Sequence, residues 1–130
     1  MSYSNPRTCM YNFPEMDFGA AAGNTTHYIA GPNGMQGRVL EVGVTTTEAT
    51  VFATTLGMVE VGTAADLDAY ALLNIATATA TKTIFNSKDD TDAIISADIP
   101  ADTTTAVTLI EGTGTGLAGK GYPYVIVDWF

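Results

Sequence analysis

A glycine-rich stretch, Gly112–Gly121, has a spacing that could bind a phosphate group. Gly114–Gly119 matches the dinucleotide-binding pattern G-x-G-x-x-G, and Gly114–Lys120 matches G-x-x-x-x-G-K. Both patterns hold phosphate where they open a helix, and the second also needs Ser or Thr after the lysine. Here Gly121 follows the lysine, and Tyr122–Val127 is typical of a strand. We therefore predict a flexible hairpin loop and no nucleotide site.

Four carboxylates on different predicted strands could supply a pair for general acid–base chemistry: Glu41, Glu60, Glu111 and Asp128. A glycosidase needs two such groups on either side of a bound sugar. The spacing along the chain gives no support for such a pair. A solvated outer face is the simpler interpretation.

Metal-binding and nucleophilic residues are scarce. The acidic turn at 86–92 offers oxygen ligands, but a calcium loop needs Glu at its twelfth position, and counting from Asp90 that position is Ala101. His27 and Cys9 are each the only residue of their type, so the chain cannot build a Cys/His zinc site. We predict no catalytic residue, no metal site and no cofactor.

Length and charge exclude several other classes of protein. The 130 residues suit one domain, and the net charge of −9 gives no basic surface for nucleic acid. The apolar runs are too short to span a membrane, and the first residues lack the apolar segment of a signal peptide. The charge is uneven: residues 1–44 carry two basic and three acidic residues (−1), and residues 45–130 carry three basic and eleven acidic ones (−8).

The N-terminal segment is rich in aromatic residues and methionine. Prolines interrupt any helix there, so we expect residues 1–24 to form an extended arm. The arm either folds back on its own domain or docks on a neighbouring chain. Aromatic residues, Met and Arg are enriched at interface cores, which favours docking and a domain that folds without residues 1–18. The candidate partner-binding residues are Tyr3, Arg7, Met10, Tyr11, Phe13 and Phe18.

The body of the chain, residues 25–130, is predicted to form β-structure. Alternating apolar and polar residues and turn signals every 8–12 residues predict about eight short strands. The clearest alternation covers Asn74–Phe85, and at most one short helix, near Leu67–Ala71, is expected. The predicted fold class is all-β: an antiparallel β-sandwich or jelly roll with an N-terminal arm.

Several short sequence segments within residues 25–130 resemble segments of a known family. They are Ala30–Val39, Thr45–Thr47, Val61–Tyr70, Ile99–Thr103 and Val127–Phe130. Together they resemble small β-rich virion proteins of tailed bacteriophages, the type that decorates or cements the head shell. The resemblance covers residues 25–130 and does not include the arm.

The resemblance implies a structural virion protein without enzymatic activity. Its expected partners are the major capsid protein and further copies of itself, as a trimer, with no nucleic acid and no membrane. The net charge of −9 disfavours contact with packaged DNA, so the expected location is the outer surface of the capsid. Two alternatives stay open: a neck, tail or head-fibre component, and a carbohydrate-binding jelly-roll module.

Overall fold

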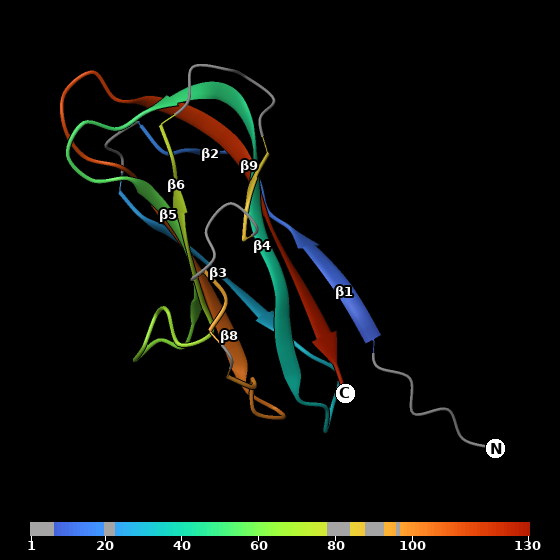
Figure 1. Ribbon diagram of the computed structural model, residues 1–130. Helices are drawn as coiled ribbons and strands as arrows, with labels where there is room; N and C mark the ends of the chain where they lie inside the picture. Colours follow the sequence, from blue (N-terminus) through green and yellow to red (C-terminus); the bar gives the residue numbers. More distant parts are fainter. Residues whose placement is uncertain (1–6, 20–22, 78–83, 88–92, 96) are drawn as a thin grey trace.

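The computed structural model describes residues 7–19, 23–77, 84–87, 93–95 and 97–130. Within these ranges the chain forms nine β-strands and no helix, arranged as two packed antiparallel sheets (Figure 1). The prediction of an all-β antiparallel sandwich is confirmed. The strands are β1 (Arg7–Asn12), β2 (Met16–Asp17), β3 (Thr25–Ala30), β4 (Gly37–Val51), β5 (Gly57–Gly62), β6 (Ala71–Ile75), β7 (Ile84–Asn86), β8 (Thr104–Ile110) and β9 (Ala118–Trp129).

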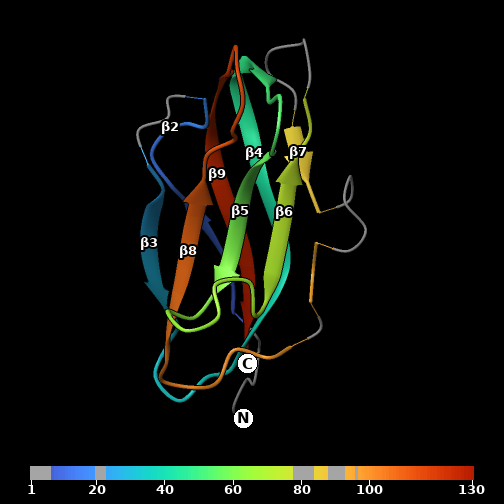
Figure 2. The same cartoon turned by 90° about the vertical axis from the view of Figure 1, so that its left-hand side faces the viewer.

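The strands pair from the outside of the sequence inwards. β1 pairs with β9, β3 with β8, β4 with β7, and β5 with β6. Two further pairings, β4 with β9 and β5 with β8, join these pairs into sheets. The first sheet has the order β1-β9-β4-β7, with β2 also on β9, and the second has the order β3-β8-β5-β6 (Figure 2).

The core lies between the sheets and is built by strand alternation. Val125 and Val127 of β9 point inwards and are fully buried, as are Val59 and Val61 of β5. Trp129, the single tryptophan, is 1% exposed in the same row as the valines of β9. β-branched side chains pack well on a pleated surface, so these valines favour both the strand and its burial.

The N-terminal segment belongs to the sandwich, which corrects the predicted boundary at residue 24. β1 pairs with β9 over its whole length, from Arg7 opposite Trp129 to Asn12 opposite Tyr124. Beyond it, the backbone N–H of Phe18 donates to the carbonyl of Gly119 (2.8 Å). From Arg7 to Phe18 the segment is therefore an edge of the first sheet and not a free arm.

Two local predictions were wrong. The predicted strand Asn74–Phe85 is not one element: β6 belongs to the second sheet and β7 to the first, and residues 78–83 lie outside the described part of the chain. The short helix near Leu67–Ala71 is a turn, in which the N–H of Asp66 donates to Thr63 Oγ1 (3.0 Å). The threonine hydroxyl there satisfies the backbone without a helix.

Candidate interaction surface

Exposed apolar side chains lie in cross-strand rows on the outer face of the first sheet. Met10 of β1 stands opposite Ile126 of β9, and Leu40 is exposed at the β-bulge beside them. Further along, Tyr122 and Ile84 stand on either side of Thr45. The exposed fractions of Met10, Leu40, Tyr122 and Ile84 are 54%, 49%, 49% and 52%. Large apolar groups gathered on one face mark a site of interaction.

Two described charged side chains near these rows, Arg38 and Asp128, are bound to partners within the chain. Arg38 Nη2 forms an ion pair with Asp98 Oδ1 (2.8 Å), and its guanidinium lies 5.7 Å from the centre of the Phe130 ring. Asp128 accepts a hydrogen bond from Thr8 Oγ1 (3.1 Å). A partner that covers this face would therefore meet charges that are already satisfied.

Tyr124 makes the middle of this face flat. It lies on the outer side of β9 but is only 7% exposed, because its ring covers Gly43 of β4. A Cβ atom at Gly43 would lie 2.4 Å from the ring, so only glycine fits there. The Tyr124 hydroxyl donates to Glu41 Oε2 (2.8 Å) and holds the ring in place.

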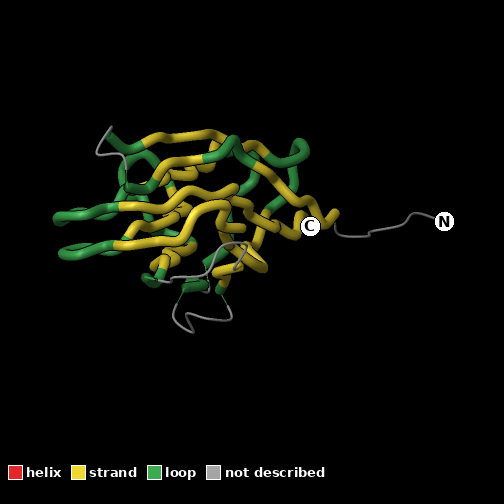
Figure 3. Tube along the Cα trace, turned by 90° about the horizontal axis from the view of Figure 1, so that it is seen from above, coloured by secondary structure: helices red, strands yellow, loops and turns green. Residues whose placement is uncertain are grey.

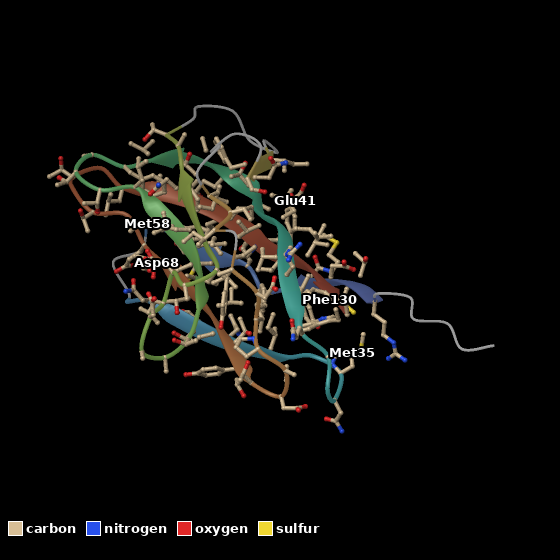
Figure 4. All side chains as sticks on the ribbon, turned by 60° about the horizontal axis from the view of Figure 1, so that its bottom comes forward. Met35, Glu41, Met58, Asp68 and Phe130 are labelled. Carbon is tan, nitrogen blue, oxygen red and sulfur yellow. The ribbon has the colours of Figure 1, made fainter. Side chains whose placement is uncertain are left out.

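The outer side of the second sheet differs in charge. Glu60 of β5 lies near Asp66 and Asp68 in the loop that follows β5, and Figure 4 shows Asp68 apart from Glu41 of the first sheet. Burial, then the charges of Asp68 and Asp66, raise the pKa of Glu60 above its ordinary value. A side-chain hydrogen bond with Asp68, which favours the protonated form of Asp66, is the largest cause that raises the pKa of Asp66. The ion pairs that the described residues form, Arg38–Asp98 and Lys120–Glu48, both involve strands of the first sheet.

The predicted partner-binding residues divide into two groups. Arg7 and Met10 are exposed on β1, while Tyr3 lies outside the described residues. Tyr11 is half-buried, and its hydroxyl accepts a hydrogen bond from Trp129 Nε1 (2.9 Å). Burial, as the largest cause, raises the pKa of Tyr11. Of this group, Met10 belongs to the apolar outer face.

Phe13 and Phe18 are enclosed in the core of their own chain. Phe13 is 8% exposed and stacks on His27 of β3, with 5.1 Å between ring centres. Phe18 is fully buried. The docking prediction is wrong for these two residues, because a side chain inside its own core cannot contact a neighbour. For them the segment folds back on its own domain.

The glycine pattern of Gly112–Gly121 has a structural explanation. Two loops lie side by side, and the N–H of Thr54 donates to the carbonyl of Thr113 (2.8 Å) (Figure 3). A Cβ atom at Gly114 would lie 2.5 Å from the Ala53 side chain, and Gly114 has a φ of 124°. The glycines before Ala118 let the loops approach closely. The predicted loop is too long at its end, because β9 begins at Ala118 and contains Gly119 and Gly121.

The candidate acid–base residues are distributed over the two sheets. Glu60 belongs to the second sheet, whereas Glu41 and Asp128 lie on the first and bind Tyr124 and Thr8. Glu111 follows β8 and accepts a hydrogen bond from the N–H of Gly23 (3.0 Å). Among the described residues, no group of three His, Cys, Asp or Glu side chains could hold a metal ion.

The acidic turn is described only at its beginning. Asn86 stands opposite Gly43 at the end of β7, and the N–H of Ser87 donates to the carbonyl of Val42 (2.9 Å). Residues 88–92 lie outside the described ranges. No helix in the described part of the chain is long and apolar enough to cross a membrane.

Comparison with known proteins adds no relative. No protein-family model matches the chain, and no curated protein matches it. The assignment of function therefore depends on the residues of this chain and their arrangement.

The sequence did not single out Leu40, Tyr122, Ile84 or Ile126 as surface residues. The signal for two of them was the run Tyr122–Val127, which is apolar at nearly every position. A strand with one solvated face should alternate apolar and polar residues. A strand that is apolar on both faces should be buried on both. In β9 the inner side is covered by the core, and the outer side is the surface described here.

Proposed function

We propose that the protein is a non-enzymatic structural component of a virion, a cement protein that binds the outer surface of the major capsid protein shell. The outer face of the first sheet is the surface that contacts the shell. The observation that carries this proposal is the set of half-exposed apolar side chains on that face, Met10, Leu40, Tyr122 and Ile84. Apolar and aromatic side chains without unpaired charge are typical of interface cores.

The strand order supports the finer fold that the family resemblance implies. Pairing of the first strand with the last, and of each next strand inwards, is the arrangement of a long hairpin rolled into two sheets. This strand order is the one expected of a jelly roll, an architecture found in viral capsid domains.

Three of the sequence segments that resemble the phage family lie together at one end of the sandwich. Gly37 and Ile99 exchange backbone hydrogen bonds, and so do Gln36 and Phe130. The N–H of Gly34 donates to Asp102 Oδ1 (2.8 Å). The segments that resemble the phage family thus form one structural unit. This supports a fold in common with that family, while the surface that contacts the shell is specific to this chain.

The charge distribution supports an external position. The chain has a net charge of −9, and Glu60, Asp66 and Asp68 gather on the second sheet. With the first sheet against the shell, these carboxylates face solvent and not the packaged nucleic acid. A protein that binds only the assembled shell stabilises it by mass action.

Binding to capsids tests the proposal. Purified protein is mixed with shells that lack it and sedimented, and variants Leu40→Lys and Tyr122→Lys are compared with Tyr28→Lys. Tyr28 is 65% exposed on β3 of the other sheet and serves as the matched control. We expect the first two variants to stay in the supernatant and the control to sediment with the shell. No sedimentation of the wild-type protein would overturn the proposal.

Copy number in purified virions separates the shell from a neck, tail or head-fibre position. A cement protein should be present in numbers comparable to the major capsid protein. A few copies at one site of the particle, seen by quantitative mass spectrometry and cryo-electron microscopy, would contradict the proposal in favour of the neck or tail.

A further inference from the structure

β1 has a free backbone edge. The N–H of Phe13 donates to the carbonyl of Pro123 (3.0 Å), directly after the register in which Asn12 stands opposite Tyr124. In an antiparallel pair, residues bond to the partner strand at alternate positions. Arg7, Cys9 and Tyr11 therefore bond to β9.

The other side of β9 gives the same assignment. Gln36 and Phe130 exchange both backbone hydrogen bonds, which continues the pairing of β4 with the even-numbered residues of β9. The odd-numbered residues of β9 are thus the ones that bond to β1. It follows that Thr8, Met10 and Asn12 direct their backbone N–H and C=O groups away from the sheet. No described strand lies beyond β1 (Figure 1).

The other described sheet edges are shorter, covered or part of the acidic second sheet. β7 has three residues. The edge of β6 is bridged by a neighbouring segment, where the N–H of Leu72 donates to the carbonyl of Ala93 (2.8 Å) and the N–H of Ile95 to that of Tyr70 (2.9 Å). β3 is open, but the acidic outer face belongs to its sheet. Among the described strands, β1 alone combines a long open edge with the apolar outer face.

β1 also has few of the features that keep edge strands apart, and Arg7 at its start is its one charged residue. Natural edges are blunted by proline, by a bulge or by charge. The register of β1 on β9 is regular, and within Arg7–Asn12 there is no proline and no acidic residue. Because the whole chain carries −9, a second copy can approach most easily where the acidic residues are missing.

We propose that β1 pairs antiparallel with β1 of a second copy, about a two-fold axis at Met10. This register places Thr8 opposite Asn12 of the other copy and Met10 opposite its equivalent. All three outward-facing residues of each strand then bond, which gives about six backbone hydrogen bonds. Pairing at Met10 is the symmetric register that uses every free group of both edges.

The pairing joins the apolar surfaces of the two copies. Met10, Ile126 and Leu40 form a row in each copy that begins at the β1 edge. Across the two-fold axis the two rows become one, and the two first sheets become one continuous sheet. The register also brings Arg7 opposite Phe13 of the second copy, two positions from its Glu15, so opposite charges approach at both ends. The pairing is independent of the proposed function.

Opposite charges introduced at Met10 test the pairing. Met10 is more than half exposed, so Met10→Lys and Met10→Glu should both fold, as circular dichroism can verify. Sedimentation equilibrium should give a dimer for the wild-type protein. In each variant alone, like charges meet at the axis, and we expect the Kd for self-association to rise at least about tenfold. A mixture of the two variants should form a mixed dimer.

Tyr28→Lys and Tyr28→Glu on the β3 edge are the matched controls, and both should remain dimeric. Hydrogen exchange gives a second measurement without substitution. The amides of Thr8, Met10 and Asn12 should become protected as the concentration passes the Kd, while the amide of Tyr11 is protected throughout.

Three results would overturn the proposal. They are a wild-type monomer or trimer over the whole concentration range, failure of the mixed variants to associate, and dissociation by the Tyr28 variants. A wild-type dimer that fails to bind shells would contradict only the proposed function, and a wild-type monomer that binds shells would contradict only the pairing.

Discussion

Two neighbouring parts of the N-terminal segment, alike in composition, reach opposite environments. Arg7–Asn12 forms an edge strand with a largely exposed surface, whereas Phe13–Phe18 places three apolar side chains in the core. Both parts contain aromatic residues and one methionine. The first is held by backbone bonds to β9, and the second by burial of Phe13, Met16 and Phe18. Composition therefore identified an unusual segment without showing which half is an anchor and which is a surface.

Small residues on β9 account for the difference. Phe18 bonds to the backbone of Gly119, and Met16 stands opposite Gly121. Further along, β1 faces Val125 and Val127, whose side chains fill the inner layer. Large side chains from the N-terminal segment enter the core only where the facing strand leaves room for them.

Removal of residues 1–18 should have the largest effect. The sequence favours a folded remainder, but the structure loses Phe13, Met16 and Phe18 from its core and one edge of β9. We expect circular dichroism to show no cooperative unfolding transition. Removal of residues 1–6, which takes away none of the described contacts, is the control and should leave the transition in place. A folded 19–130 fragment would show that the anchor is dispensable.

Phe18→Ala tests the buried part of the segment, Phe13–Phe18, which is called the anchor. The side chain is fully buried, so its truncation should lower the free energy of unfolding by about 3–5 kcal/mol. Urea unfolding followed by Trp129 fluorescence measures the change. A loss below about 1 kcal/mol would mean that the core closes without this residue.

Tyr11→Phe addresses the boundary between the two parts. The variant leaves the buried Trp129 Nε1 without its partner, which should cost about 1–3 kcal/mol at neutral pH. Because the pKa of Tyr11 is raised in the folded state, its ionisation favours unfolding as the pH rises above about 10. The wild-type protein should therefore lose stability more steeply than Tyr11→Phe in alkaline urea titrations. Parallel curves would contradict burial of this hydroxyl.

Met10→Ala should have the smallest effect on stability. The side chain is 54% exposed, so we expect the free energy of unfolding to change by less than about 0.5 kcal/mol in dilute solution. The same variant should weaken self-association in concentrated solution. A large loss of stability in the dilute monomer would remove the distinction between edge and anchor.

Much of the fold could be predicted from local patterns. Alternation around Val42 and Val59 follows from the pleat of a strand and identifies the buried face. Alternation does not show which strands pair, because threonine and alanine suit either side of a sheet. The stretch 74–85 was read as one strand for this reason, although its two ends belong to different sheets.

The candidate surface was less predictable. Met10 belongs to the aromatic-rich segment that the sequence identifies as a candidate. Leu40 and Ile84 lie on strands distant in sequence, and they share a face with Met10 only because β9 and β4 join these strands into one sheet. A single sequence contains no information on this neighbourhood. Phe13 and Phe18 could not be separated from Met10, because burial depends on the strand opposite and not on residue type.

The pairing of β1 with β9 also determines when the protein can fold. β9 is the central strand next to both β1 and β4, yet it follows all the other described strands in the sequence. During synthesis the first sheet cannot form until β9 has been made, whereas β5 and β6 can form a hairpin earlier. Contacts between residues far apart in sequence slow folding. We therefore expect the second sheet to nucleate folding and the N-terminal segment to dock last.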